Sequence, residues 1–256
     1  MKPQKKILRF MKILVCISKA PDTTSRIAFT DNSTAFDENG VQFIVNPYDE
    51  WYALVRALEL KEANGGSVTT VTVGGADCDP IIRKALAIGS DDAVRIDASP
   101  QDSLFVAKQI AAYAKDNSFD LVLLGKETID YNGAVVGGMV AELMDVPFVS
   151  FAVKMDVAGS TATLEREVQG GVEIVEVELP LVVSAAKGMA EQRIPNMRGI
   201  MAARSKPLQI VAAQEFSVST TIIRYELPPA KAAVKLVSAD NVEELVQLLH
   251  TEAKVI

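Results

Sequence analysis

The chain has 256 residues, of which 49% are hydrophobic and 23% charged, and its formal net charge is −7. This composition is typical of a globular protein with a substantial core, and the acidic balance excludes a general attraction to nucleic acid or anionic membranes. Cys16 and Cys78 stand far apart without a CxxC motif, and His250 is the single histidine. We therefore expect a reduced, cytoplasmic protein without a disulfide framework, a metal site or histidine-based catalysis.

The first ten residues, 1–10, are expected to be an extension ahead of the first strand, "KILVCIS" (12–18). The leading lysines suggest a signal peptide, but Arg9 and Lys12 interrupt the apolar run and no small-residue cleavage site follows. No stretch approaches the ~20 apolar residues that a membrane span needs, so no transmembrane segment is expected.

Strand and helix patterns alternate through about the first 150 residues. The expected elements after the first strand are helix 46–63, strand 67–75, helix 79–89, strand 92–97, helix 101–117, strand 119–125 and a helix that runs to about Met144. The first helix has a clear start, with Asn46 as candidate N-cap, Pro47 at the first helical position, and Asp49 and Glu50 in the first turn. The alternation predicts an α/β fold, a doubly wound, mostly parallel sheet with helices on both faces.

The pattern then changes to strands. Residues 161–179 alternate at period two around Gly170-Gly171, which predicts a β-hairpin with a glycine turn, and residues 180–186 form a further buried strand. We expect residues 11–205 to form one α/β domain that carries the hairpin.

Residues 206–256 are expected to form a C-terminal arm. It contains an extended, proline-rich stretch (225–236) and ends in a helix (239–253). Such a segment cannot readily build a core of its own, so it either packs back on its own domain or docks on another chain. Composition alone leaves both possibilities open.

The loop "GKETIDYNGAVVGG" (125–138) follows a buried strand and enters a helix. In a doubly wound sheet, ligands bind beyond the carboxyl ends of the strands, where segments 18–24 and 73–79 also arrive. The backbone N–H groups of Gly133–Val136, with the helix dipole behind them, would form an anion site, and Gly125 would let the backbone approach a ligand. Neither GxxxxGK(S/T) nor GxGxxG is present, so these glycines could instead only turn the chain; nucleotide binding is favoured.

Groups that could catalyse a reaction are few. The loops carry hydroxyl and carboxylate side chains at Ser18, Thr23, Thr24, Asp22, Asp49 and Asp130. The hydroxyls have no local base, and such aspartates usually cap turns and helices. The sequence therefore predicts a binding or carrier role rather than an enzyme.

Residues 188–207, "GMAEQRIPNMRGIMAARSKP", mix methionine and isoleucine with arginine and lysine. Methionine is adaptable and arginine is favoured at interfaces, so this segment favours a loop that docks on protein partners. The alternative is an ordinary helix with a methionine-rich core face, although Pro195 and Gly199 argue against a long regular helix.

Several segments resemble, in the same order, the β subunit of the electron transfer flavoproteins. They are "VNPYDE" (45–50), "IIRKALAIGSD" (81–91), "DLVLLGKETID" (120–130), "LEREVQGGVE" (164–173) and the run from "LPLVVSA" to "MRGIMAARSKP" (179–207). The resemblance extends from Met11 to the end of the chain and implies an adenine nucleotide alpha hydrolase-like fold. It also implies a heterodimer with an α subunit that holds most of the redox-active FAD, while the β subunit buries a structural AMP.

Carried over residue by residue, the resemblance implies an AMP site. Its residues would be Cys16, Asn46, Pro47, Tyr48, Asp49, Val73, Gly125, Lys126, Glu127, Thr128, Ile129, Asp130, Tyr131, Asn132, Gly133, Ala134, Val135 and Val136. Ala134–Val136 stand where the family often has polar side chains, which a phosphate held by backbone groups tolerates. Some relatives bind a second FAD in place of AMP and bifurcate electrons; this alternative stays open, with AMP favoured.

The resemblance also implies docking residues. They would be Glu191, Arg193, Ile194, Pro195, Met197 and Ile200 in a recognition loop, with Met197 as the apolar anchor for partner dehydrogenases. Glu167 would hold the mobile flavin domain of the α subunit, or is simply a strand residue that faces solvent. Electrons would pass from acyl-CoA and related dehydrogenases through FAD to a quinone oxidoreductase, while residues 206–256 dock on the α subunit. Two other readings are a stand-alone ATP-binding α/β enzyme, for which an SGGxDS-like loop is missing, and a structural subunit with an empty pocket.

Overall fold

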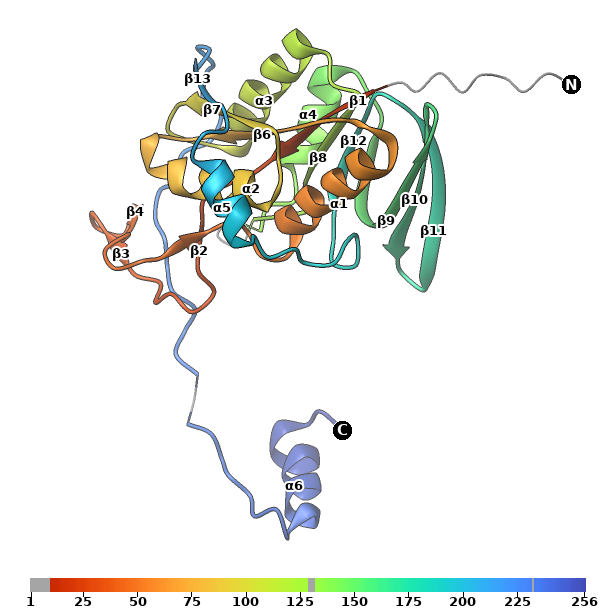
Figure 1. The fold of residues 1–256 in the computed structure, drawn as a ribbon. Helices are drawn as coiled ribbons and strands as arrows, with labels where there is room; N and C mark the ends of the chain where they lie inside the picture. The colour runs from red at the N-terminus through yellow and green to blue at the C-terminus, as the bar shows by residue number, and fades with distance from the viewer. Residues whose placement is uncertain (1–9, 129–131, 232) are drawn as a thin grey trace, which may run out of the picture.

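The computed structural model describes residues 10–128, 132–231 and 233–256, and within them nine strands form one main sheet (Figure 1). The strands of this sheet are β1 (Met11–Cys16), β6 (Gly66–Val73), β7 (Asp92–Asp97), β8 (Leu121–Gly125), β9 (Phe148–Ala158), β10 (Thr161–Val168), β11 (Gly171–Glu178), β12 (Leu181–Ala185) and β13 (Leu208–Ala212). Their order is β11-β10-β9-β12-β8-β1-β6-β7-β13. Every pair from β9 to β13 in this order is parallel, and only β9–β10 and β10–β11 are antiparallel. The predicted α/β fold with a mostly parallel sheet is confirmed.

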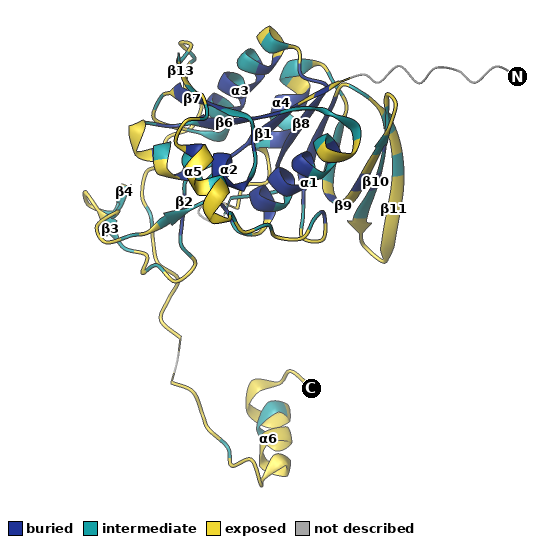
Figure 2. Ribbon diagram, viewed as in Figure 1, coloured by how far each residue is buried: buried dark blue, intermediate teal, exposed yellow. Residues whose placement is uncertain are grey.

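Helices cover both faces of the main sheet. The helices are α1 (Asp49–Asn64), α2 (Asp79–Ile88), α3 (Ser103–Asn117), α4 (Val136–Met144), α5 (Met197–Ala203) and α6 (Val242–Leu248), with short turns η1 (Ala76–Cys78) and η2 (Leu249–Ala253). Ile13 and Val15 of β1 pack with α1, whereas Leu14 packs with α3 and α4 on the opposite face. From Ile13 to Cys16 the strand is a continuous apolar run, as expected where both faces are buried, and it lies in the dark blue centre of Figure 2.

The chain reverses direction across the sheet at β1. From β1 it moves outward to β6 and β7, and it then returns to place β8 on the other side of β1. This reversal is the topological switch point at which open α/β sheets bind ligands, beyond the carboxyl ends of the strands. Two small ribbons, β2–β5 (Ala20–Pro21 with Phe43–Ile44) and β3–β4 (Phe29–Thr30 with Ala35–Phe36), lie in the segment between β1 and α1.

Helix α1 begins later than the sequence predicts. Its N-cap is Tyr48 and its first residue is Asp49, so the predicted N-cap role of Asn46 and first helical position of Pro47 are wrong. Asn46 instead forms a turn ahead of the helix, where its side-chain oxygen accepts the N–H groups of Tyr48 (3.1 Å) and Asp49 (3.4 Å). Its side-chain nitrogen separately donates to the carbonyl of Glu127 in a distant loop.

Strand β9 was not among the elements expected from the sequence. Phe148–Ala152 pair with β12 in parallel, and the strand then continues antiparallel to β10. The change falls next to Phe151, which has a φ of 55°. The predicted hairpin follows as β10 and β11; its turn is Gln169-Gly170, with Gly170 at a φ of 86°, and Gly171 already pairs with Val168.

The C-terminal segment first adds a strand to the sheet and then leaves it. β13 pairs with β7, so the main sheet takes its edge strand from the segment expected to be the arm, just past the predicted boundary at residue 205. The chain then passes the β3–β4 ribbon and extends to α6, which lies apart from the sheet (Figure 1). The predicted helix 239–253 is shorter, as Val242–Leu248 followed by one wider turn. Within the described residues, no helix combines the length and apolar character needed to span a bilayer.

Candidate functional site

The carboxyl ends of three central strands meet at the switch point. β1 ends at Cys16, β6 at Val73 and β8 at Gly125, and these strands are parallel neighbours in the order β8-β1-β6. α1 starts beside the end of β8, and α4 follows β8 in the chain. The described residues among those expected to bind a ligand are therefore brought to one edge of the sheet.

Gly125 is required by the packing of α1 on β8. A Cβ atom at this position would lie 2.9 Å from both the Cβ of Asp49 and the backbone nitrogen of Glu50. The sequence suggested that this glycine leaves room for a ligand, whereas its close neighbour is the first turn of α1. The absence of a side chain brings the start of that helix to the end of β8.

The first half of the loop after β8 is held at two points. The N–H of Lys126 donates to the carbonyl of Ala185 at the end of β12 (2.9 Å). The side-chain amide of Asn46, itself 1% exposed, donates to the carbonyl of Glu127 (2.9 Å). The loop is thus tied both to the neighbouring strand and to the turn that precedes α1.

The second half of the loop is exposed and has an unusual backbone. Asn132 and Ala134 adopt φ values of 46° and 53°, and the N–H of Asn132 donates to the carbonyl of Thr128 (2.9 Å). Gly133 between them has no positive φ, and residues 132–135 are exposed before α4 begins at Val136. Backbone in which left-handed residues alternate with others can turn several N–H groups toward one anion.

Three of the expected binding residues, Ile129, Asp130 and Tyr131, lie outside the described residues. Among the others, Pro47, Val73 and Thr128 are half-buried and Tyr48 is 52% exposed. The thiol of Cys16 is buried among the residues that pack against α3 and α4, and this burial, followed by the charge of Glu50, raises its pKa. Cys16 is therefore an inert packing residue in its thiol form, and only its backbone belongs to the edge of the site.

A buried carboxylate lies beneath the loop. Asp49 is 4% exposed, and burial raises its pKa to about 6, although the nearby Lys126 cation and a hydrogen bond with the Glu127 backbone act in the opposite direction. Lys126 is in turn paired with the Glu127 carboxylate at 2.9 Å. A perturbed carboxylate at a strand end is typical of functional sites.

Sequence reasoning missed the contact that closes the end of β1. The carboxylate of Glu50, which is 5% exposed, accepts the backbone N–H of Ser18 (2.9 Å) and also the hydroxyl of Ser18. The contact joins the segment after β1 to the first turn of α1. In the sequence, Glu50 carries only the signal of an acidic residue at a helix start, and nothing pairs it with a serine 32 positions away.

The predicted recognition loop is anchored on α1. The indole N–H of Trp51 donates to the carbonyl of Arg193 (3.3 Å), and the Arg193 guanidinium pairs with Glu62 at 2.6 Å. Asn196 caps α5 by accepting the N–H of Gly199 (2.8 Å). The segment is thus a fixed loop followed by one short helix, in agreement with the expected absence of a long one.

The apolar residues of this loop form an exposed surface. Ile194 is 82% exposed, Met197 74% and Ile200 43%, and Glu191 is also exposed, whereas Arg193 and Pro195 are half-buried. We call Ile194, Met197, Ile200 and the 57%-exposed Met201 the apolar ridge. Exposed apolar side chains gathered in this way mark interaction surfaces.

Glu167 lies on the exposed part of β10, opposite Val172 of β11. The pKa of Lys126 is raised by its pairing with Glu127, with smaller contributions from Asp49 and Glu167. The hairpin carboxylate therefore acts electrostatically on the start of the loop after β8.

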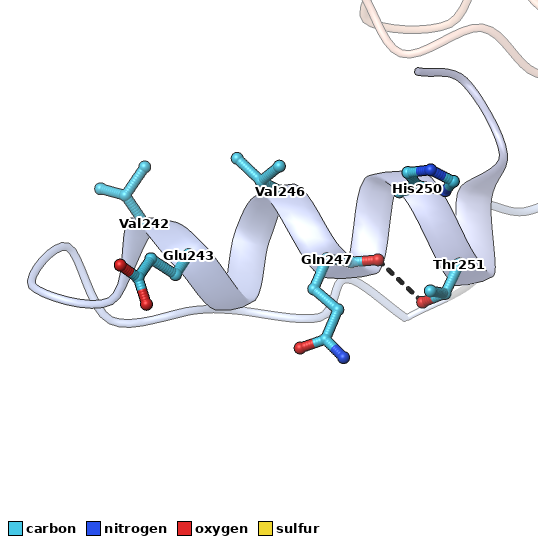
Figure 3. Close-up of a pocket in the computed structure, with 6 residues that line it drawn as sticks. All are labelled: Val242, Glu243, Val246, Gln247, His250 and Thr251. Atoms are coloured by element: carbon cyan, nitrogen blue, oxygen red, sulfur yellow. Dashed lines mark hydrogen bonds between the residues drawn. The ribbon is translucent and has the colours of Figure 1, made fainter.

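A separate hollow lies along α6 rather than at the strand ends. Figure 3 shows Val242 and Val246 on this helix and His250 on the turn η2 that follows it, and these residues line the hollow. Since these residues belong to the segment that leaves the sheet, the hollow is an uncovered helix face and not part of the loop site.

Comparisons with known proteins agree on one family. A sequence model of the electron transfer flavoprotein domain matches residues 33–216. The chain is 38% identical over 261 residues to the electron transfer flavoprotein subunit beta of Bacillus subtilis (strain 168), covering 96% of this chain and all of that protein. It is 35% identical to the same subunit of Syntrophomonas wolfei, covering 87% and 88% of the two chains, and 32% identical to that of Homo sapiens, covering 93% and 96%.

Proposed function

The chain belongs to the electron transfer flavoprotein family, as a β subunit, and on this basis we propose that it forms a heterodimer with an α subunit and binds AMP at the loop after β8. The observation that supports this most is the loop itself. It is tied to β12 through Lys126 and to the turn ahead of α1 through Asn46, and it presents exposed backbone at the switch point.

AMP fits the groups that are present. The exposed backbone of Gly133–Val135 and the start of α4 would hold the phosphate, because a helix N-terminus and converging N–H groups favour an anion. Asn46 and Lys126 would keep the loop in place. Apolar side chains at Val135 and Val136 do not oppose this role, since backbone groups rather than side chains make the contact. AMP in this position stabilises the fold and takes no part in a reaction.

The FAD would belong mainly to the α subunit and, when bound, would supply the redox chemistry. The residues of this chain would position the flavin domain, with Glu167 as the contact on the hairpin. The exposed arm beyond β13 would dock on the α subunit. The chain is thus proposed to be a carrier subunit without catalytic side chains of its own.

The apolar ridge on α5 and the loop before it would dock electron-donating dehydrogenases, such as acyl-CoA dehydrogenases. Met197 is the proposed anchor because it is 74% exposed on a helix whose preceding loop is fixed to α1 through Arg193. Buried aromatic, methionine and arginine side chains are enriched at the centres of interfaces. Electrons would then pass from the flavin to a quinone oxidoreductase.

The test is to co-express the chain with its candidate α subunit, purify the complex, denature it and quantify the released nucleotides by chromatography. One FAD and one AMP per heterodimer are expected. Two FAD without AMP would replace the AMP proposal by a second flavin and electron bifurcation, whereas the absence of both complex and nucleotide would overturn the proposed function.

A matched pair of variants connects this result to the loop. Asn46→Ala removes the hydrogen bond to the Glu127 carbonyl together with those from the Tyr48 and Asp49 N–H groups, and it should lower the AMP content while the FAD content stays at one. Asn39→Ala changes an exposed asparagine in the segment between β1 and α1 and should leave both unchanged. Equal AMP contents in the two variants would contradict a role of the anchored loop.

A further inference from the structure

The segment after β13 has two parts with different surroundings. We call residues 213–225 the arm root and residues 226–256 the arm tip. The arm root contacts α3 and the β3–β4 ribbon. In the described residues of the arm tip, the hydrogen bonds join the tip to itself or to the root, as in the Lys235–Glu252 pair at 3.0 Å and the Arg224–Glu226 pair.

Gln109 in the middle of α3 binds the backbone of the arm root. Its side-chain N–H donates to the carbonyl of Gln214 (2.7 Å), and its side-chain oxygen accepts the N–H of Gln214 (3.0 Å). Gln109 is 2% exposed. A buried amide is costly unless it is hydrogen-bonded, and both polar atoms of this side chain are satisfied by the arm root. The side-chain amide of Gln109 thus bonds to both the N–H and the carbonyl of Gln214, the two backbone groups that a paired β-strand would otherwise bind.

Asp102 joins the start of α3 to the arm root with a single carboxylate. Oδ1 accepts the N–H of Phe105 (2.6 Å) and caps the helix. Oδ2 accepts the N–H groups of Ser219 (2.7 Å) and Thr220 (2.9 Å). Oδ1 therefore caps the helix locally, whereas Oδ2 binds a segment more than a hundred residues away in the chain.

The β3–β4 ribbon holds the end of the arm root. The N–H of Tyr225 donates to the carbonyl of Ser33 (2.7 Å), and the rings of Tyr225 and Phe29 stack at a centroid distance of 5.1 Å. Earlier in the root, the Lys108 ammonium of α3 lies 5.7 Å from the centre of the Phe216 ring. Contacts are thus spaced along the whole root and end at residue 225.

The arm tip presents apolar side chains without cover. Val234 is 80% exposed and Leu236 89%, and Val242 and Val246 lie uncovered on α6 (Figure 3). An extended segment loses less conformational entropy on binding if its start is already ordered. Contacts that order the root therefore favour whatever the tip binds.

We propose that Asp102 and Gln109 are positioning residues for subunit assembly. They order the arm root on α3, with the β3–β4 ribbon as the last support, so that the arm tip is presented to the α subunit from a fixed starting point. The inference rests on the proposed function, because the α subunit is the occupant assigned to the tip.

Two substitutions separate this role from the stability of α3. Asp102→Asn keeps one acceptor oxygen, enough to cap the helix, but turns an NH₂ group toward the N–H groups of Ser219 and Thr220. Gln109→Met keeps the length of the side chain and removes both bonds to Gln214. Thr220→Val is the control, since it removes only a long hydroxyl contact of 3.4 Å and retains the backbone N–H.

Hydrogen exchange on the isolated chain tests the ordered root without any partner. The amides of Gln214, Ser219, Thr220 and Tyr225 should be protected, because each donates a hydrogen bond to α3 or to the ribbon. Asp102→Asn should remove protection at 219 and 220 while the Phe105 amide stays protected. Unprotected amides in the unaltered chain would overturn the inference.

Binding to the α subunit tests the assembly role. Asp102→Asn and Gln109→Met should each weaken the heterodimer by roughly three- to tenfold, mainly through slower association, because the tip then starts from a disordered root. Thr220→Val should bind like the unaltered chain. Variants that lose amide protection but bind with full affinity would overturn the positioning role alone. No complex with the unaltered chain would instead overturn the proposed function, and the assembly role with it.

Discussion

At the scale of single residues, burial of Asp49 disfavours the charged form of its carboxyl group. Its pKa rises from 3.8 to about 6 in the folded chain, so the folded state binds more protons than the unfolded state between these values. Stability contributed by this group is therefore lost as the pH rises from about 4 to 6. A carboxylate kept at this energetic cost beneath the loop supports a functional role for the site.

Asp49→Asn should raise the free energy of unfolding of the nucleotide-free chain at pH 7 by about 1–3 kcal/mol, since the amide carries no charge to bury. The gain should shrink as the pH falls from 6 to 4 and disappear by about pH 3, where Asp49 is protonated in both the folded and the unfolded state. Urea unfolding at the two pH values measures the effect, with Asp116→Asn at an exposed position as control. An equal gain at both pH values would show that charge is not its cause.

Met197 is the second residue whose role can be isolated. Met197→Ala shortens a side chain that is 74% exposed, so folding stability and bound nucleotide should be unchanged. The KM for a partner dehydrogenase should rise by about tenfold if this side chain is an interface anchor. Steady-state electron-transfer assays of the heterodimer measure this KM. The control variant is Ile210→Ala, because Ile210 is an apolar residue on β13 that is 58% exposed. Unchanged transfer from the dehydrogenase would remove Met197 from the proposed surface.

At the scale of elements, two cationic side chains, Arg83 and Lys206, join the carboxyl-terminal ends of α2 and α5. Arg83 of α2 donates to the carbonyls of Ala203 and Lys206 (both 2.8 Å). Lys206 donates to the carbonyls of Leu86 (2.9 Å) and Ser90 at the end of α2. Each cation thus satisfies carbonyl groups that the other helix leaves without partners. This reciprocal contact fixes the α5 part of the apolar ridge on α2.

Gly199→Ala tests how closely α5 packs on α2, and Gly138→Ala in α4 is the matched control. A Cβ atom at Gly199 would overlap the carbonyl oxygen of Ala87, so Gly199→Ala should destabilise the chain by about 1–3 kcal/mol and weaken dehydrogenase docking. Gly138 of α4 is also helical but would meet only the Phe148 ring at 3.6 Å, so Gly138→Ala should stabilise by about 0.5–1 kcal/mol. Urea unfolding measures both. A stabilising Gly199→Ala would contradict the close contact.

At the scale of the whole molecule, the sheet with its helices and the arm tip are separate structural units. Removing residues 226–256 should leave the melting temperature of the isolated chain within about 2 °C of its original value, since the tip has no hydrogen bond to the sheet domain among the described residues. The shortened chain should no longer form a heterodimer. Calorimetry and gel filtration with the α subunit measure these outcomes, and removal of residues 254–256 alone is the control. A large fall in melting temperature would show that the tip packs on its own domain.

Local patterns were sufficient for most elements. The strand predicted at 92–97 has those bounds, and the helix predicted at 79–89 is found as Asp79–Ile88 with Gly89 as its C-cap. Hydrophobic periodicity and turn residues act over a few positions, so they can be read along the chain. The start of α1 was misplaced because Asn46 has the chemistry of an N-cap, whereas it forms a turn with Tyr48 and Asp49 and the helix begins only at Asp49. Strand β9 was not predicted because its backbone changes direction at Phe151, and the strand pairs with β12 up to Ala152 and with β10 from Ala152 onward.

What the sequence determined by itself is the alternation of the main strands and helices from β1 to α4, the β10–β11 hairpin, and the family resemblance that the comparisons confirmed. Only the tertiary structure decided which distant groups meet. Asn46 contacts Glu127 from 81 positions away, and Asp102 contacts Ser219 from 117. Such pairs depend on where the sheet topology places each strand end and each helix start, and no local preference of the chain specifies them.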